Sequence, residues 1–269
     1  MENDGIYEAL AKGEIRMKSS MGIIPAHTQF TFTPKQIEDS LRKDKRFKLL
    51  SFAEEKAKPK DSEAAYVAEI EYKGNSYLVI LDVIPINGLD LRNYGFANHI
   101  DEEAMQAATK PQFYLQTTIE YYNNSIDSFH FQLKIMDAIV PEACLVIDFM
   151  SYRLLSAKWL KMTAESQTPP SPEYLYTIHY VYDEDEKEGM SYWLHSHGLH
   201  RCGFTELEMV NIKQGIDQMS TLLNTVIKNF LADPKPEMEQ FQIAYDGLGI
   251  HLCWQRWENA ISRFPEKML

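Results

Sequence analysis

The stretch from residue 66 to residue 84 restricts the fold most, because it predicts two adjacent antiparallel strands. Apolar side chains alternate with more polar ones from Tyr66 to Tyr72, and a period of two is typical of a strand with one buried face. Gly74 and Asn75 can adopt the positive φ values of a tight turn. Residues 77–84 then form a largely apolar run, which favours a strand inside a sheet.

Helical periodicity is the second strong signal. Residues 33–36 supply an N-cap threonine, a proline at the first helical position and a capping-box glutamine, so they predict a helix from Pro34 to about Arg46. Apolar residues at three- and four-residue steps predict further helices at 126–140 and 212–230. Between them, the β-branched run 143–147 is too short for a typical helix and indicates a buried strand. Helices that alternate with strands predict a layered α+β fold.

Weaker patterns complete the prediction. They indicate short strands at 28–32, 113–121, 174–182, 192–194, 241–245 and 250–255, and a helix at 154–161. Six apolar residues on the inward faces of these elements are expected to be buried, namely Phe129, Leu133, Leu145, Ile147, Leu223 and Phe230.

We therefore expect an α+β protein with two units of mainly antiparallel sheet packed against helices. Residues 1–25 are predicted to form an N-terminal helix and loop, residues 26–106 the first unit, and residues 107–269 the second. The proline-rich stretch 168–172 and the acidic stretch 183–189 are expected to be surface connectors.

Charge and composition narrow the classes of partner. The 27 lysine and arginine residues against 39 aspartate and glutamate residues leave a net charge of -12, which repels nucleic acid and anionic membranes and suits a basic protein or a cation. Acidity is also an ordinary route to solubility, and that interpretation of the charge is preferred. Three widely spaced cysteines, Cys144, Cys202 and Cys253, are expected to be reduced thiols. Residues 1–4 lack a basic leader region, and no apolar run reaches the roughly 20 residues of a membrane helix. We expect a cytoplasmic protein.

The segment from Trp193 to Glu208 holds the densest group of chemically active residues. Side chains two apart on a strand share a face, so His195 and His197 can point at one cation. Glu206 and Glu208 have the same spacing, and the four groups together would make a mixed nitrogen and oxygen metal site.

A structural interpretation of the same segment stays open and is preferred. In it the histidines line a strand, Gly198 and Gly203 let the backbone turn, and Arg201 pairs with Glu206 or Glu208. It is favoured because no second ligand motif, such as HExxH, accompanies the histidines. We accordingly predict no cofactor, although His200 and Cys202 are additional potential ligands.

Other chemistries have less support. Ser196 and Cys202 lie near His197 but have no nucleophile elbow around them, and the sequence contains neither a Walker A motif nor GxGxxG. Two functional classes stay open. The preferred one is a noncatalytic protein-interaction module, including an acidic inhibitor or immunity-type factor that binds a basic protein; the alternative is a metal-dependent hydrolase that uses His195, His197, Glu206 and Glu208.

The same segment carries a family resemblance. It reads WLHSHGL from Trp193 to Leu199, continues with Arg201 and Gly203, and ends with ELE at residues 206–208. This resembles the WLH-T/S-HGL-x-R-x-G-x-x-ELE core of a bacterial family named domain of unknown function 4026. The resemblance implies a bacterial cytoplasmic protein in which this segment matters for structure or for function.

Overall fold

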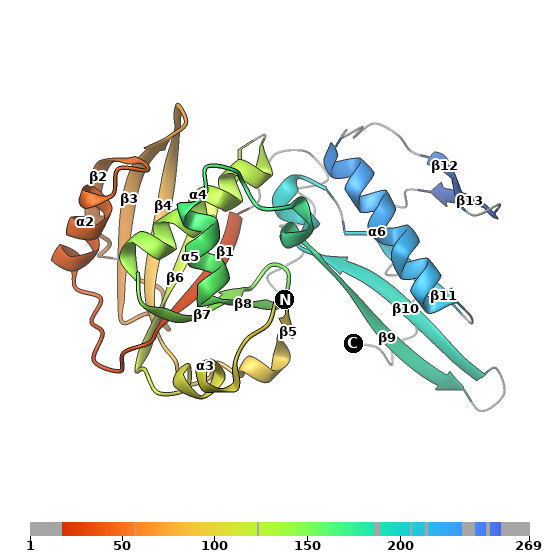
Figure 1. The fold of residues 1–269 in the computed structure, drawn as a ribbon, viewed down its shortest axis with the longest axis horizontal. Coiled ribbons are helices and arrows are strands. Elements are labelled where there is room, and N and C mark those ends of the chain that lie inside the picture. Colours follow the sequence, from red (N-terminus) through yellow and green to blue (C-terminus); the bar gives the residue numbers. More distant parts are fainter. Residues whose placement is uncertain are drawn as a thin grey trace.

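The structure of the protein, a computed structural model, consists of a large sheet with its helices and a smaller C-terminal part (Figure 1). It describes residues 18–56, 58–122, 124–185, 189–204, 206–212, 215–232, 240–245 and 248–253. The helix expected within the first 17 residues lies outside this part of the chain.

The large sheet has eight strands in the order β2-β3-β4-β6-β1-β7-β8-β5. The strands are β1 (Lys18–Pro25), β2 (Lys48–Glu54), β3 (Ala64–Tyr72), β4 (Asn75–Pro85), β5 (Gly95–Phe96), β6 (Phe113–Glu120), β7 (Ala143–Asp148) and β8 (Arg153–Ser156). All neighbours are antiparallel except β5 and β8. β1 lies near the centre, between β6 and β7.

Helices cover both faces of this sheet unequally. α2 (Pro34–Lys43), α4 (Ser125–Ile139) and α5 (Ala157–Glu165) lie on one face (Figure 1). α3 (Glu102–Ala107) contributes Met105 and Ala107 to a second core on the other face. The main core forms between the three helices and the sheet, and a smaller core forms on the side of α3. α4 is buried along most of its length, so it is the central helix of the protein.

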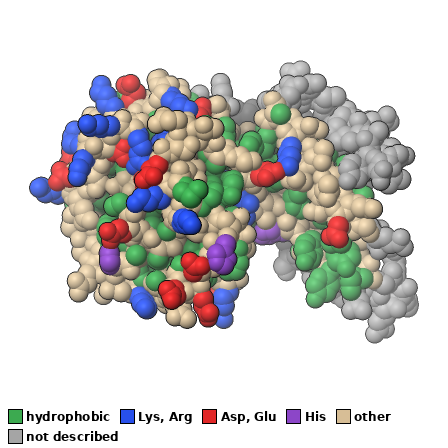
Figure 2. Space-filling view, viewed as in Figure 1, with side chains coloured by type: hydrophobic (Ala, Val, Ile, Leu, Met, Phe, Trp, Pro, Cys, Tyr) green, Lys and Arg blue, Asp and Glu red, His purple; other side chains and the backbone are tan. Residues whose placement is uncertain are grey.

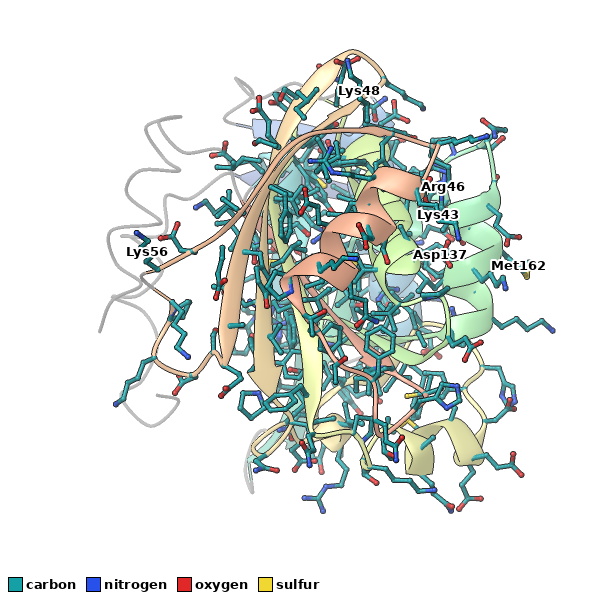
Figure 3. The ribbon with its side chains drawn as sticks, turned by 90° about the vertical axis from the view of Figure 1, so that its left-hand side faces the viewer. Lys43, Arg46, Lys48, Lys56, Asp137 and Met162 are labelled. Carbon is teal, nitrogen blue, oxygen red and sulfur yellow. The ribbon has the colours of Figure 1, made fainter. Side chains whose placement is uncertain are left out.

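Arg46 fastens the end of α2 to α4. Its guanidinium donates hydrogen bonds to Asp137 of α4 at 2.7 Å and to Asp44 (Figure 3). It also donates to the carbonyl oxygen of Ala164 at the end of α5. This half-buried ion-pair network therefore ties all three helices of the layer together.

The C-terminal part holds a separate three-stranded sheet in the order β11-β10-β9. Its elements are β9 (Thr177–Asp185), β10 (Gly189–His197), β11 (Glu208–Ile212), α6 (Ile216–Ala232), and a hairpin of β12 (Gln240–Tyr245) and β13 (Leu248–Cys253). Short 3-10 helices are η1 (Leu91–Asn93), η2 (Pro172–Leu175) and η3 (Leu199–Cys202). β9 and β10 form a long hairpin that extends away from the large sheet (Figure 1).

The α+β prediction and several local predictions are confirmed. Thr33 caps α2 with its hydroxyl, and β3 and β4 form the expected hairpin, with Lys73 and Gly74 rather than Gly74 and Asn75 in the turn. Of the six residues expected to be buried, all are buried except Phe230, which is half-buried. None of the described helices combines the length and the apolar character that crossing a membrane requires.

Other predictions differ from the structure. Residues 18–25, expected in an N-terminal helix and loop, form the central strand β1. Residues 28–32 form no strand, because this segment has no neighbouring strand to pair with and the Phe32 carbonyl instead accepts from Tyr66. The helix expected at 154–161 begins at Ala157, after strand β8. The boundary expected between residues 106 and 107 falls inside the eight-stranded sheet.

Candidate functional site

Three histidines meet on one face of the small sheet. His195 and His197 lie two residues apart on β10, and the register pairs His195 directly with His179 of β9. Each offers a ring nitrogen, and the three nitrogens all lie within 4.8 Å of one another. The ring centroids of His195 and His197 are 4.6 Å apart. His179 therefore lies on the same face of the sheet as His195 and His197.

The surroundings of the three imidazoles lower the pKa of each and favour its neutral form. Burial, followed by the neighbouring His195 and His179, lowers the pKa of His197 to about 4. Burial also lowers the pKa of His195 and that of His179. A neutral imidazole keeps one nitrogen lone pair free, so the cluster presents three acceptors at neutral pH with no proton to displace.

A tyrosine of the large sheet closes one side of the cluster. Tyr152 lies in the turn between β7 and β8 with a positive φ of 52°, a conformation that non-glycine residues adopt at some cost. Its ring centroid is 4.8 Å from that of His197 and 6.1 Å from that of His179. The cluster thus lies where the large sheet meets the β9–β10 hairpin.

Glu206 does not join the histidines. Its carboxylate accepts hydrogen bonds from Ser196 Oγ at 2.6 Å and from the backbone N–H of Gly198 at 2.9 Å and of His200 at 3.2 Å. His200 Nδ1 lies 2.7 Å from the same carboxylate. Burial alone would raise the pKa of Glu206, but the hydrogen bonds from His200 and Ser196 outweigh it and lower the pKa. Ser196 lies between His195 and His197 on the strand, so it projects from the opposite face. Glu206 binds Ser196 on that face and accepts from the backbone at the start of η3, away from the histidines.

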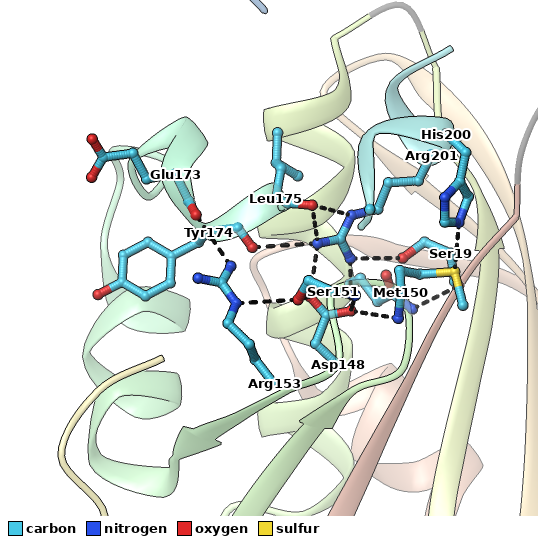
Figure 4. Close-up of polar contacts among 12 residues, drawn as sticks. Ser19, Asp148, Met150, Ser151, Arg153, Glu173, Tyr174, Leu175, His200 and Arg201 are labelled. Carbon is cyan, nitrogen blue, oxygen red and sulfur yellow. Dashed lines mark hydrogen bonds and ion pairs between the residues drawn. The ribbon is translucent and has the colours of Figure 1, made fainter. Parts of the chain in front are cut away.

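Arg201 connects the small sheet to the large one. The sequence led us to expect an ion pair with Glu206 or Glu208, but η3 turns this side chain toward β7, where it binds Asp148 (Figure 4). The two guanidinium-to-carboxylate distances are 2.9 and 2.7 Å. The same guanidinium donates to the carbonyl oxygen of Leu175. Arg201 is only 2% exposed, so this is a fully buried bidentate pair.

The two glycines of the segment allow the turn that carries Arg201. Gly198 has a φ of 106° and Gly203 a φ of 82°, and they flank η3 on either side. Both values lie in the region that favours glycine. Gly198, Arg201, Gly203 and Glu206 therefore shape and anchor this turn. His195 and His197 lie on the strand before it, with ring nitrogens close to that of His179.

His179 is the site residue that we did not predict. The strand patterns at 174–182 and 192–194 and the acidic connector between them were recognised, and a tight hairpin centred near residue 187 would have placed His179 opposite His195. The register of a hairpin was thus the missing signal. Among the described residues, His179, His195 and His197 are the one group of three or more potential ligands whose ligand atoms all lie within 4.8 Å of one another.

The fold and the site define a two-part α+β protein in which a buried arginine–aspartate pair joins the parts and three imidazoles lie at their junction. A family model for the N-terminal part of a protein of unknown function (DUF4026) matches residues 19–170, and the model for the C-terminal part matches residues 178–269. The chain belongs to this family, as its core motif predicted. No curated protein and no solved structure matches the chain.

Proposed function

We propose that this protein binds a divalent transition metal through His179, His195 and His197. The convergence of the three ligand nitrogens within 4.8 Å supports this function. Neutral imidazole is the common protein ligand for zinc, iron, cobalt and nickel. Three histidines leave further coordination positions for water or substrate, which is the arrangement that a metal-dependent hydrolase requires.

An unsatisfied polar atom supports the same function. Within the described part of the chain, His195 Nδ1 is buried and has no hydrogen-bond partner. Buried polar atoms in native proteins nearly always have one. A bound ion would supply the missing partner, either directly at a ring nitrogen or by fixing the tautomer that the ring adopts.

Metal analysis of the purified, untagged protein tests this function. After chelation, dialysis and reloading with zinc, manganese, iron, cobalt or nickel, we expect one equivalent to be retained by the wild type. The double variant His195→Ala/His197→Ala should retain none, because a single remaining imidazole is a weak ligand. His99→Ala is the matched control, since that histidine is exposed and pairs with Asp101. Failure of the wild type to retain any of these ions would refute the function.

A noncatalytic interaction function is the second candidate, and the surface of the hairpin favours it. Half of the exposed large hydrophobic residues among those described lie on β9, β10 and β11, namely Tyr180, Val181, Tyr182, Met190 and Val210. Hydrophobic side chains gather over this hairpin in Figure 2. The acidic stretch 183–188 carries five acidic residues and one lysine; its first three residues form the end of β9, whereas the sequence predicted a connector there. An exposed apolar surface beside negative charge suits a basic protein partner, such as the target of an immunity-type factor in a bacterial cytoplasm.

Affinity capture from a bacterial lysate tests the interaction function. We expect a basic protein to be retained at low salt and released at high salt, because salt screens complementary charge. Tyr180→Ser/Tyr182→Ser should abolish retention, since both tyrosines are more than half exposed. Leu78→Ser is the matched control, being similarly exposed but located on β4 of the large sheet. Recovery of no basic protein at either salt would count against this function.

A further inference from the structure

Glu208 is the carboxylate closest in register to the three histidines. It opens β11 and pairs directly with His195 across the sheet. Directly opposed residues in an antiparallel pair project on the same face, with Cβ atoms about 4.5–5.5 Å apart. Glu208 therefore shares the face that carries His179, His195 and His197, whereas Glu206 faces the other way.

The carboxylate of Glu208 has no partner among the described residues. No hydrogen bond or ion pair reaches it there, although the side chain is half-buried. A half-buried carboxylate that accepts from none of the described residues is free to accept a cation there.

Further unsatisfied polar atoms lie on the same face. His195 Nδ1 is buried without a hydrogen-bond partner within the described residues, and so is the hydroxyl oxygen of Thr177. Thr177 lies opposite His197 in the register of β9 and β10. Together with the Glu208 carboxylate, these atoms surround the histidine cluster with groups able to accept but lacking a donor. An ion at the cluster would give the Glu208 carboxylate a partner, and a water on that ion could hydrogen-bond to the Thr177 hydroxyl.

We propose that Glu208 is the fourth protein ligand, so that the ion is held by three imidazole nitrogens and one carboxylate oxygen. This inference rests on the proposed metal function. The Glu208 carboxylate lies outside the group of three nitrogens that are mutually within 4.8 Å. A side-chain rotation would have to bring it to the ion, and within the described part of the chain no hydrogen bond or ion pair has to break for that rotation. Glu206 is excluded from this role because its oxygens are occupied by Ser196, Gly198 and His200.

The fourth ligand decides which metals suit the site. Carboxylate oxygen is preferred by hard ions such as Mn²⁺, whereas imidazole suits nickel and zinc. A carboxylate also adds a negative charge that partly neutralises the ion. Three nitrogens and one oxygen leave two positions of an octahedron open. The site should therefore accept Mn²⁺ and Fe²⁺ considerably better than three imidazoles alone would.

Competition titrations with MnCl₂ and NiCl₂ on the wild type and on Glu208→Gln test this assignment. We expect the substitution to weaken Mn²⁺ binding by at least about tenfold and Ni²⁺ binding by less, because the lost ligand is the hard one. The visible spectrum of the Co²⁺-loaded protein should also change, since it reports the ligands of the ion. Glu120→Gln, which alters an exposed carboxylate at the end of β6, should leave both readouts unchanged.

The outcomes separate this inference from the function on which it rests. If the wild type retains no metal, the proposed metal function fails and the inference with it. If the wild type binds metal and His195→Ala/His197→Ala does not, while Glu208→Gln keeps the Co²⁺ spectrum and the Mn²⁺ to Ni²⁺ affinity ratio of the wild type, the metal function stands. In that case Glu208 is not a ligand, and the inference is overturned. Circular dichroism of each variant establishes that it is folded.

Discussion

Replacing Asp148 by alanine is expected to lower the free energy of unfolding by about 3–5 kcal/mol, because it leaves a buried guanidinium without its counter-ion. Arg201 is 2% exposed, and burial alone would lower its pKa, but Asp148 outweighs burial and raises it. The aspartate also accepts hydrogen bonds from Ser151 and from the backbone of Met150 in the β7–β8 turn. Chemical denaturation followed by circular dichroism measures the loss.

An exposed ion pair provides the control for Asp148. Asp90 and Arg92 form a pair at 2.8 Å on the surface, and the Asp90 carboxylate also caps η1. Asp90→Ala should lower the denaturation midpoint far less than Asp148→Ala, because water replaces the exposed partner and only a short 3-10 turn loses its cap. In Asp148→Leu/Arg201→Met neither charge is buried, so part of the loss should be recovered. A destabilisation no larger for Asp148→Ala than for Asp90→Ala would contradict the role that we assign to the buried pair.

Gly198→Ala is expected to be the other severely destabilising substitution. A Cβ atom at this position would lie 2.4 Å from the carbonyl oxygen of Leu175, which is backbone and accepts hydrogen bonds from Arg201. The positive φ of 106° adds strain of about 1–3 kcal/mol. The clash should therefore displace both η3 and the guanidinium, and thermal denaturation should show a marked fall in Tm.

Gly203 separates the two contributions at Gly198. It also has a positive φ, of 82°, but a Cβ atom there would meet nothing within 4 Å. Gly203→Ala should therefore show only the backbone strain. Equal losses of stability for Gly198→Ala and Gly203→Ala would mean that the close approach to Leu175 is relieved cheaply, contrary to our expectation.

Local signals predicted the parts of the fold that depend on neighbouring residues. The capping threonine, proline and glutamine at 33–36 located α2, and alternation located β3 and β4. The sequence did not predict β1, because its hydrogen-bonding partners, β6 and β7, lie far away in the chain. Gly22 resembles a loop residue in the sequence, yet in the sheet it makes room for the rings of Phe149 and Tyr114, which would lie 3.1–3.2 Å from a Cβ atom there.

The site was predictable to the same extent. The period of two correctly puts His195 and His197 on one face, because that spacing needs only a strand. The same spacing wrongly grouped Glu206 with the two histidines. The chain leaves β10 before Gly198 and enters the next strand, β11, only at Glu208. The ion pair between Arg201 and Asp148 joins residues 53 positions apart, and no local pattern indicates such a partner.

The position of β1 also governs the order in which the sheet can be assembled. Ribosomes synthesise this strand before every other strand of the sheet, yet its two neighbours, β6 and β7, are among the later ones. Met21 and Thr117 contact each other across 96 residues, and closing a flexible loop of that length costs about 4 kcal/mol of chain entropy. The meander of β2, β3 and β4 has much shorter connections and can form while β1 is still unpaired. An early, apolar and initially partnerless strand is the kind of segment that chaperones protect during synthesis.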